Sequence, residues 1–294
     1  MDLGTIHDYL VLNPKGPIGA DEKDLIILAT VLMLIVVLPV FVLTLYFAWH
    51  YRASNTKATY APNWSHSGRI EAVCWLVPCA IVAILSAVCW ISTQRLDPSR
   101  EIAAASKPIE VEVVSLDWKW LFIYPDLKIA SVNELAFPVG TPVHFRITSG
   151  SVMNAFFIPQ LGSQIYTMSA MQTQVNLLAS EAGDYTGLSA NFSGDGFSDM
   201  RFDAKAMSAA EFDGWVKTVR ASKDSLTLAS YRQLVQPSER VPVSYYGAVE
   251  PHVFHDVLNQ CADGSLCRDD AMRFAMLQDG DAGKLCTPAK PRGL

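Results

Sequence analysis

The stretch between Ser151 and Met200 contains six positions with the spacing of a metal site. Their side chains are two hydroxyls, two carboxamides, a phenyl ring and one thioether. A soft transition metal needs thiolate or imidazole donors, whereas a hydroxyl is a hard neutral ligand and a phenyl ring is no ligand. A lone thioether is too weak to hold a metal, so we expect this site to be empty. The six positions are Asn154, Ser189, Asn191, Ser193, Phe197 and Met200.

The spacing of these positions resembles the copper loop of subunit II of the haem-copper respiratory oxidases. In that family a His lies in an apolar strand that ends in Pro, as Asn154 lies before Pro159 here. Cys, Glu, Cys, His and Met follow at the spacing of residues 189, 191, 193, 197 and 200, and the set holds a dinuclear copper centre. Only Met200 is retained in this chain. The resemblance therefore implies a degenerate copper site that binds no metal.

Three further motifs, with the same substitutions, resemble subunit II of the bo-type ubiquinol oxidases. They are Asn63-Trp-Ser-His-Ser67, Asp117-Trp-Lys-Trp-Leu-Phe-Ile-Tyr-Pro125 and Gln164-Ile-Tyr166, and the likeness runs from about Leu12 to about Trp215. It implies a subunit of a proton-pumping enzyme that oxidises ubiquinol and reduces oxygen to water. In the family the haems, the copper and the quinol site belong to the large subunit, so we expect this chain to bind no cofactor and to hold no catalytic residue.

The composition limits the class of protein. Of the 294 residues, 50% are hydrophobic and only 18% are charged, which favours a membrane protein over a soluble one. The net charge is −6 and no basic block occurs, so we expect no nucleic-acid partner. The expected partners are the large subunit (subunit I), other oxidase subunits and membrane lipid, with ubiquinol bound only by the complex.

Two apolar runs, residues 25–49 and 70–93, are predicted to be transmembrane helices. At ~1.5 Å per residue, the first exceeds the ~30 Å hydrocarbon layer of a bilayer. Residues 50–69 between them contain three Lys and Arg residues and no carboxylate, so the positive-inside rule places this loop in the cytoplasm. Both termini and the large C-terminal part are then predicted to lie in the periplasm, on a bacterial inner membrane.

The N-terminal segment, residues 1–24, is polar and rich in turn residues, and Asn13–Gly19 is predicted to be a loop. It shows no secretory signal, whereas subunits II of the bo type resemble lipoproteins at their start. Either the leader is left out of this sequence or the N-terminus crosses the membrane without one.

After a linker at residues 94–107, the hydrophobic period changes to two. Residues 109–113 and 143–147 alternate as strands with one buried face do. With the resemblance, residues 108–205 are predicted to form a cupredoxin-like β-sandwich or barrel without a copper site. Residues 206–294 are predicted to be a C-terminal helical extension and tail, which makes the chain an α+β membrane protein. A capping box from Ser208 to Glu211 opens the first helix of the extension.

Glu71 stands where the second transmembrane run enters the membrane. A carboxylate at this depth is costly unless it is hydrated or paired. One interpretation is an interfacial Glu in contact with water. The resemblance implies the other, which we adopt, because in the family a Glu at this place lies near the mouth of a proton-uptake route into the large subunit.

Three smaller groups of residues need an interpretation. A Cys261–Cys267 disulfide is conceivable, but sequence leaves the pairing open. His252 and His255 stand three residues apart without a third ligand nearby, which makes a metal site there improbable. The aromatic residues between Trp118 and Tyr124 are interpreted as core and interface packing.

The residues leave two alternative functions to weigh. A cytochrome c oxidase subunit II with a working copper centre would need Cys at positions 189 and 193, which are Ser. A membrane-anchored cupredoxin acting as a copper assembly factor would need exposed Met and His ligands, and this region offers Met200 beside Met168 and Met171.

Overall fold

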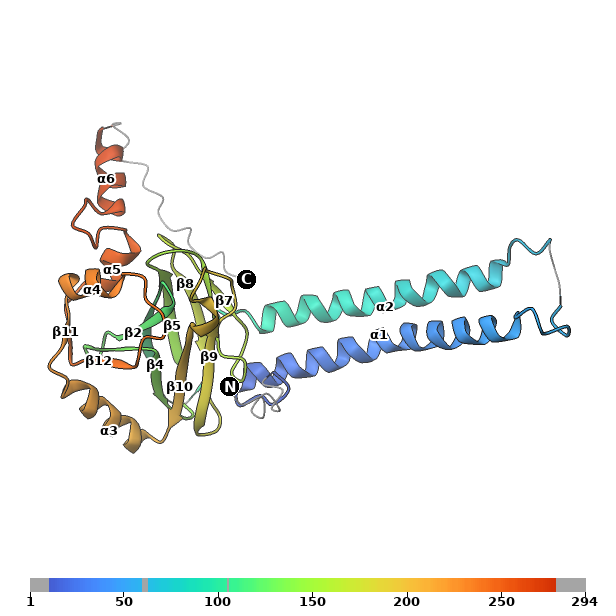
Figure 1. Ribbon diagram of the computed structural model, residues 1–294, viewed down its shortest axis with the longest axis horizontal. Coiled ribbons are helices and arrows are strands. Elements are labelled where there is room, and N and C mark those ends of the chain that lie inside the picture. The colour runs from blue at the N-terminus through green and yellow to red at the C-terminus, as the bar shows by residue number, and fades with distance from the viewer. Residues whose placement is uncertain (1–10, 60–62, 105, 279–294) are drawn as a thin grey trace. The chain divides into compact units, whose positions relative to one another are not determined.

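The computed structural model describes residues 11–59, 63–104 and 106–278 of the chain (Figure 1). Ala20–Arg100 form one compact unit, and the residues on either side of this segment form the other. The first unit is helical, and the second is built on β-sheets. The predicted tail beyond residue 278, with Cys286, lies outside the described residues.

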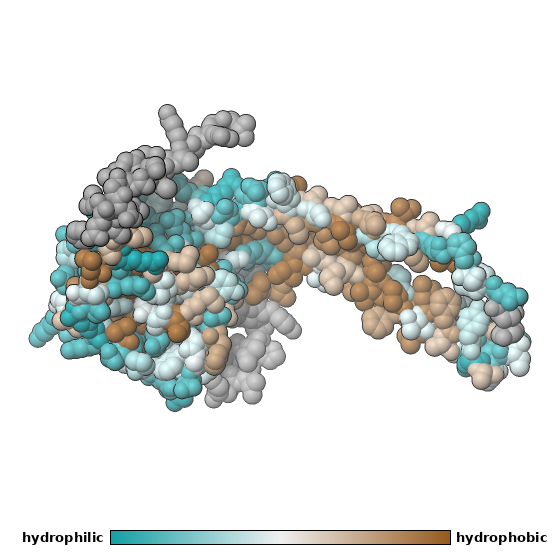
Figure 2. Space-filling view, turned by 90° about the horizontal axis from the view of Figure 1, so that it is seen from above, coloured by the Kyte–Doolittle hydropathy of each residue, from teal (hydrophilic) through white to brown (hydrophobic). Residues whose placement is uncertain are grey.

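The helical unit consists of helices α1 (Pro17–His50) and α2 (Gly68–Arg95). They contain the two runs predicted to span a membrane, and both are long and apolar enough to do so. Their apolar side chains are exposed, as the brown surfaces in Figure 2 show, and the Leu45 side chain is 70% exposed. Apolar surface of this extent is unfavourable in water, so it requires lipid or a protein partner.

Helix α1 begins earlier than the sequence predicts. The expected loop at Asn13–Gly19 ends at Gly16, and Pro17 is the first helical residue. Proline suits this position because its missing N–H would have no intrahelical acceptor. The first three residues of α1 belong to the sheet-containing unit, in which the Gly19 N–H donates to the carbonyl of Leu161 at 3.2 Å. The loop prediction for the last three of these residues is therefore wrong.

The sheet-containing unit is a sandwich of two β-sheets with a shared hydrophobic core. The first sheet has the strand order β12-β3-β2-β1-β5-β8 and the second has the order β4-β10-β9-β6-β7. The strands predicted at residues 109–113 and 143–147 are present as β1 and β5, which pair in parallel. The sandwich strands are β1 (Ile109–Leu116), β2 (Lys119–Tyr124), β3 (Ile129–Val132), β4 (Glu134–Pro138), β5 (Val143–Ser149), β6 (Asn154–Phe157), β7 (Ile165–Thr167), β8 (Thr173–Leu177), β9 (Gly183–Ser189), β10 (Arg201–Met207) and β12 (Ser244–Tyr246).

The elements of the C-terminal extension are α3 (Ala209–Arg220), β11 (Ser225–Leu226), α4 (Leu228–Leu234), β13 (Ala248–Val249), α5 (Val253–Leu258) and α6 (Arg268–Gln278). Helix α3 joins the core between the sheets through Phe212, Val216 and Val219, and the segments from β11 to α5 pack on the outer face of the first sheet. In β2, Trp120 and Phe122 point into the core between the sheets, while Leu121 and Ile123 point into a second core beneath the extension. Strand β2 is thus buried on both faces, whereas the alternating pattern predicts strands with one buried face.

The boundary predicted after residue 205 differs from the observed one. Strand β10 runs to Met207, and the extension contributes β12, in which Tyr245 pairs with Ser131 of β3. Strand β12 covers an edge of the first sheet that would otherwise expose unpaired backbone groups. The predicted capping box is confirmed, since the Ser208 hydroxyl accepts from the Glu211 N–H and the Glu211 carboxylate accepts from the Ser208 N–H.

Glu134, at the start of β4, joins both sheets and the extension. Its carboxylate is 3% exposed and accepts from the Lys205 ammonium at 2.6 Å, the Trp215 indole at 2.8 Å and the Tyr245 hydroxyl at 2.6 Å. These donors lie on β10, α3 and β12. Burial by itself raises the pKa of Glu134, but the hydrogen bonds from Lys205, Tyr245 and Trp215 outweigh it and hold the pKa below its ordinary value.

We predict that Glu134→Gln lowers the free energy of unfolding by about 2 kcal/mol at neutral pH, because charge-assisted hydrogen bonds to a buried group are lost. A carboxylate with a lowered pKa in the folded state stabilises that state above the ordinary glutamate pKa and loses this effect as the pH falls. The difference between wild type and variant should therefore shrink as the pH falls through and below that range. Thermal unfolding of the detergent-solubilised chain measures it, with the exposed Asp213→Asn as control. Equal effects of the two substitutions would contradict the prediction.

Candidate functional site

The six positions of the degenerate copper loop lie together at one end of the sandwich. Asn154 begins β6, Ser189 ends β9, and the loop between β9 and β10 carries the others. The 3-10 helix η2 (Phe197–Asp199) turns this loop back, and the Ser189 N–H donates to the carbonyl of Met200 at 3.1 Å. The fold therefore brings together residues that lie up to 46 positions apart in the sequence.

The polar groups of this site bind one another. The Ser189 hydroxyl donates to the side-chain oxygen of Asn154 at 3.0 Å, and both residues are buried. The Asn191 amide donates to the carbonyl of Met153 at 3.1 Å. The Ser193 hydroxyl lies 3.9 Å from the sulfur of Met200, a long contact to a weak acceptor. Hydrogen bonds among neighbours thus occupy the groups that stand at the ligand positions.

These residues do not fit a dinuclear copper centre. Hydroxyl and carboxamide oxygens are hard ligands, and the position of the second His is the phenyl ring of Phe197. That ring packs edge-on against Phe192 with the centroids 5.5 Å apart. Only the buried Met200 offers a soft donor, and its thioether is a weak ligand.

Trp118 packs over the loop from the β1–β2 turn. It adopts the left-handed backbone region, with a φ of 64°, and its indole N–H donates to the carbonyl of Ser193 at 3.2 Å. A Cβ at Gly196 would lie 2.5 Å from the indole ring, so only glycine fits there. Three of the predicted aromatic residues, Trp120, Phe122 and Tyr124, lie in the core as expected, whereas Trp118 is half-buried against the loop.

Five exposed apolar side chains lie in β7 and in the turns next to β6, β8 and β9, and we call them the loop-side patch. Phe192 is the most exposed of them at 76%. The members of the loop-side patch are Val152, Met153, Tyr166, Met171 and Phe192.

Glu71 lies in the other unit, in the first turn of α2. Its carboxylate oxygen is 2.8 Å from Nδ1 of His66, and both side chains are more than half exposed. His66 belongs to the quoted motif around Trp64, but sequence reasoning assigned it no role. The signal was its position five residues before the carboxylate, at the start of the helix.

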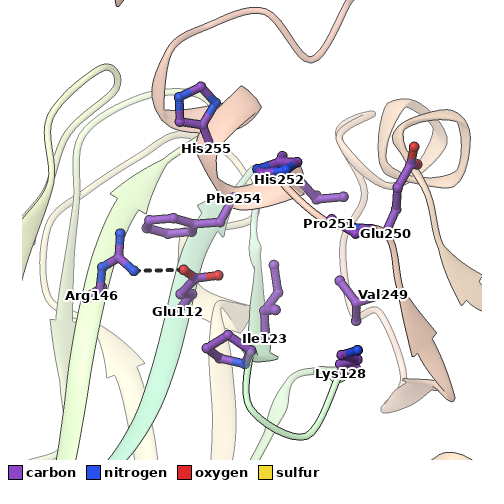
Figure 3. Close-up of a pocket in the computed structure, with 12 residues that line it drawn as sticks. Glu112, Ile123, Lys128, Arg146, Val249, Glu250, Pro251, His252, Phe254 and His255 are labelled. Atoms are coloured by element: carbon purple, nitrogen blue, oxygen red, sulfur yellow. Dashed lines mark hydrogen bonds and ion pairs between the residues drawn. The ribbon is translucent and has the colours of Figure 1, made fainter.

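A cavity of about 520 Å³ lies between the first sheet and residues 249–255 of the extension (Figure 3). Arg146 of β5 is 3.0 Å from the Glu112 carboxylate of β1, and its guanidinium stands over the ring of Phe254 (Figure 3). Burial raises the pKa of Glu112, and Arg146 only partly offsets this rise. Sequence reasoning missed this site because its walls come from elements far apart in the chain.

The two histidines and two cysteines that the sequence analysis singled out lie in the C-terminal extension. His252 and His255 have ring centroids 6.3 Å apart, and His255 instead lies 3.2 Å from both Asp256 and Asp269. The Cys261–Cys267 disulfide, which the sequence left open, is formed.

Comparison with known proteins gives one family model and several close relatives. Residues 220–265 match the model described as the COX Aromatic Rich Motif. The chain is 58% identical to subunit 2 of the cytochrome bo(3) ubiquinol oxidase of Pseudomonas aeruginosa over 253 residues, which are 86% of this chain and 76% of the relative. It is 50% identical to ubiquinol oxidase subunit 2 of Acetobacter aceti over 277 residues, 94% of this chain and 86% of the relative. The crystal structure of the periplasmic domain of subunit II of the cytochrome oxidase of Bradyrhizobium japonicum is 22% identical, covers 40% of this chain and 94% of that domain, and has a TM-score of 0.37.

We predict that Gly196→Ala destabilises the loop, because the added methyl group must displace the Trp118 indole. Overpacking of this kind costs about 1–3 kcal/mol, and the tryptophan fluorescence should change with it. Thermal unfolding and the emission spectrum of the full chain are the measurements. Gly214→Ala is the matched control, since a Cβ there meets nothing within 4 Å, and in helix α3 it should stabilise by up to about 1 kcal/mol. An unchanged stability and spectrum for Gly196→Ala would refute the packing argument.

Proposed function

Since this chain belongs to the subunit II family of the bo-type ubiquinol oxidases, we propose that it serves its oxidase as a structural and proton-collecting subunit whose degenerate loop holds no copper. Such a complex oxidises ubiquinol and reduces oxygen to water. The haems and the copper of that reaction belong to subunit I, the large catalytic partner. The observation that carries the proposal is the set of hydrogen bonds that ties the former ligand positions to one another.

Ubiquinol, the proposed electron donor, is consistent with a subunit that lacks copper. Ubiquinol is a lipid-soluble molecule and delivers its electrons from within the membrane, so a copper relay on the water side has no electrons to pass on. The hydroxyl of Ser189 and the amide of Asn154, both buried, are then free to stabilise the loop through their own hydrogen bond. Use of ubiquinol as the electron donor and the absence of the copper ligands are therefore consistent with each other.

The proposed topology is a helical hairpin in a bacterial inner membrane. Helices α1 and α2 cross the bilayer, and residues 51–67 between them lie in the cytoplasm with their excess of Lys and Arg. Both termini and the sandwich then lie in the periplasm. The exposed apolar surfaces of the two helices contact lipid and subunit I.

The sandwich is proposed to cover subunit I through the loop-side patch. Its exposed aromatic and Met side chains are of the types enriched at protein interfaces. Without copper, this end of the sandwich has no electron-transfer partner to bind, so we assign its exposed apolar side chains to packing against subunit I.

We predict that detergent extraction recovers the chain with a haem-containing complex that consumes oxygen with ubiquinol and not with reduced cytochrome c. The chain separated from subunit I should hold less than stoichiometric copper and show no near-infrared band of a dinuclear copper centre, because its donors are hard. Oxygen uptake with cytochrome c, together with such a band, would indicate a cytochrome c oxidase subunit. Recovery of the chain as a copper-binding monomer without haem protein would indicate an assembly factor.

Glu71 is proposed to collect protons at the cytoplasmic mouth of an uptake route into subunit I. Its exposed carboxylate can take a proton from water, and the hydrogen bond of 2.8 Å to His66 offers a second titratable group at the same place. An imidazole and a carboxylate in contact can exchange a proton along one hydrogen bond.

We predict that Glu71→Ala in the intact complex lowers oxygen-reduction turnover and its coupled proton uptake several-fold, whereas Glu71→Asp keeps part of both. His66→Ala should cause a smaller loss, because water can replace the imidazole at an exposed site. Turnover with ubiquinol and proton uptake by reconstituted vesicles measure these effects. The exposed Glu101→Ala, placed after α2, is the control and should be silent. Wild-type rates for Glu71→Ala would remove the proposed role while leaving the family assignment intact.

A further inference from the structure

The side chains around the Cys261–Cys267 disulfide form a compact set of metal donors. Sγ of Cys267, a ring nitrogen of His255 and a carboxylate oxygen of Asp256 all lie within 4.8 Å of one another. Sγ of Cys261 lies 3.9 Å from the same Asp256 carboxylate. In the disulfide the two sulfurs are bonded to each other and are poor ligands, because thiolates are what metals bind. The set therefore lacks its two strongest donors only while the disulfide is closed.

We propose that reduction of the Cys261–Cys267 disulfide converts this cluster into a Zn²⁺ site. The ligands are the two thiolates, the imidazole of His255 and the carboxylate of Asp256. Two sulfurs, one nitrogen and one oxygen make the four-coordinate set that structural zinc sites favour. Zn²⁺ is a better match than Ca²⁺ or Mg²⁺, which bind oxygen ligands.

The distances require only short movements. With Zn–S bonds of ~2.3 Å and Zn–N bonds of ~2.0–2.1 Å, tetrahedral ligand atoms lie roughly 3.3–3.8 Å apart. The donors within 4.8 Å must close by about 1 Å, and the sulfurs must separate by about 2 Å once their bond is broken. The Cys261–Cys267 loop can allow this, since residues 263–266 are exposed and Gly264 adopts a φ of 92°.

The neighbouring groups orient the imidazole for this role. Nδ1 of His255 faces Asp256, and Nε2 faces the carboxylate of Asp269 at 3.2 Å. If Nδ1 binds the metal, Nε2–H donates to Asp269, which is the carboxylate–histidine–zinc arrangement that fixes the tautomer and strengthens the ligand. His255 and Asp256 are held on α5, and the Cys261 N–H donates to the Asp256 carbonyl at 2.8 Å. Two of the four ligands thus stand on α5, a backbone hydrogen bond ties Cys261 to the same helix, and Cys267 closes the site from the loop.

The Cys261–Cys267 disulfide is reduced by thiol–disulfide exchange with a dithiol. The dithiol becomes a cyclic disulfide, and its two electrons and two protons convert the Cys261–Cys267 bond into two thiols. Binding of Zn²⁺ then releases both thiol protons, since thiolates are the ligands. The same loop, and with it the start of α6, is closed by a covalent bond when oxidised and by a metal when reduced.

The test uses the full-length chain in detergent with Cys74, Cys79, Cys89 and Cys286 replaced by Ser, so that the pair is the only thiol source. The chain is reduced anaerobically, freed of reductant and titrated with Co²⁺, which reports thiolate ligation in its absorption spectrum, and then with Zn²⁺. We expect one Co²⁺ per reduced chain with sulfur charge-transfer and tetrahedral bands, displaced by one Zn²⁺. The oxidised chain should show none.

Two substitutions distinguish a specific four-ligand site from nonspecific metal binding at the protein surface. His255→Ala should weaken binding by at least ~10-fold, because it removes a ligand of the set. His252→Ala is the matched control and should leave the affinity unchanged, since its ring is not among the converging donors. The comparison of oxidised and reduced chain needs no substitution in the cluster, so it stands even if a variant misfolds. Absence of Co²⁺ binding by the reduced chain, equal binding by the oxidised chain, or full affinity in His255→Ala would overturn the proposal.

Discussion

The sandwich unit depends on the pairing of one buried negative charge. An ionised carboxylate in a protein interior is strongly unfavourable unless charges and donors surround it. Glu134 meets this condition only when β10, α3 and β12 are all in place, because each supplies one donor. Folding of the two sheets and docking of the extension are therefore coupled through a single side chain. This coupling explains why the described residues after Met207 fold with the sandwich in one compact unit.

Hydrogen bonds and side-chain packing hold the loop that carries the six positions. A bound metal would join β6, β9 and the following loop through bonds of several donors at once. Here the hydrogen bond between Ser189 and Asn154 joins the first two, and the Trp118 indole holds the loop at Ser193. Each neutral hydrogen bond contributes only about 1 kcal/mol. The loop geometry therefore rests on several weak contacts and on the packing of Trp118 over Gly196.

Sequence reasoning was reliable where the signal is local. Apolar runs predict the long helices, alternation predicts β1 and β5, and the box at Ser208 predicts the start of α3. It failed where distant segments decide. Lys119 lies between two tryptophans and is 1% exposed, and its ammonium donates to the carbonyl of Gln236 at 2.7 Å. No pattern around Lys119 or Glu134 signals burial, because the groups that permit it lie more than 70 residues away in the chain. The six loop positions were found because their spacing, though not their chemistry, matches a known motif.

The extension also contacts the degenerate loop. Arg240 of the extension donates to the Asp199 carboxylate of η2 at 2.9 Å. The extension also binds the Lys119 ammonium, next to Trp118 in the chain, through the carbonyl of Gln236. Burial lowers the pKa of Lys119. An exposed ion pair contributes little by itself, about 0–1 kcal/mol. Together with the hydrogen bond from Lys119 to the Gln236 carbonyl, however, it ties both the loop and the turn that carries Trp118 to the extension. The segment that follows the sandwich thus restrains the loop directly at Asp199 and indirectly through the turn that carries Trp118.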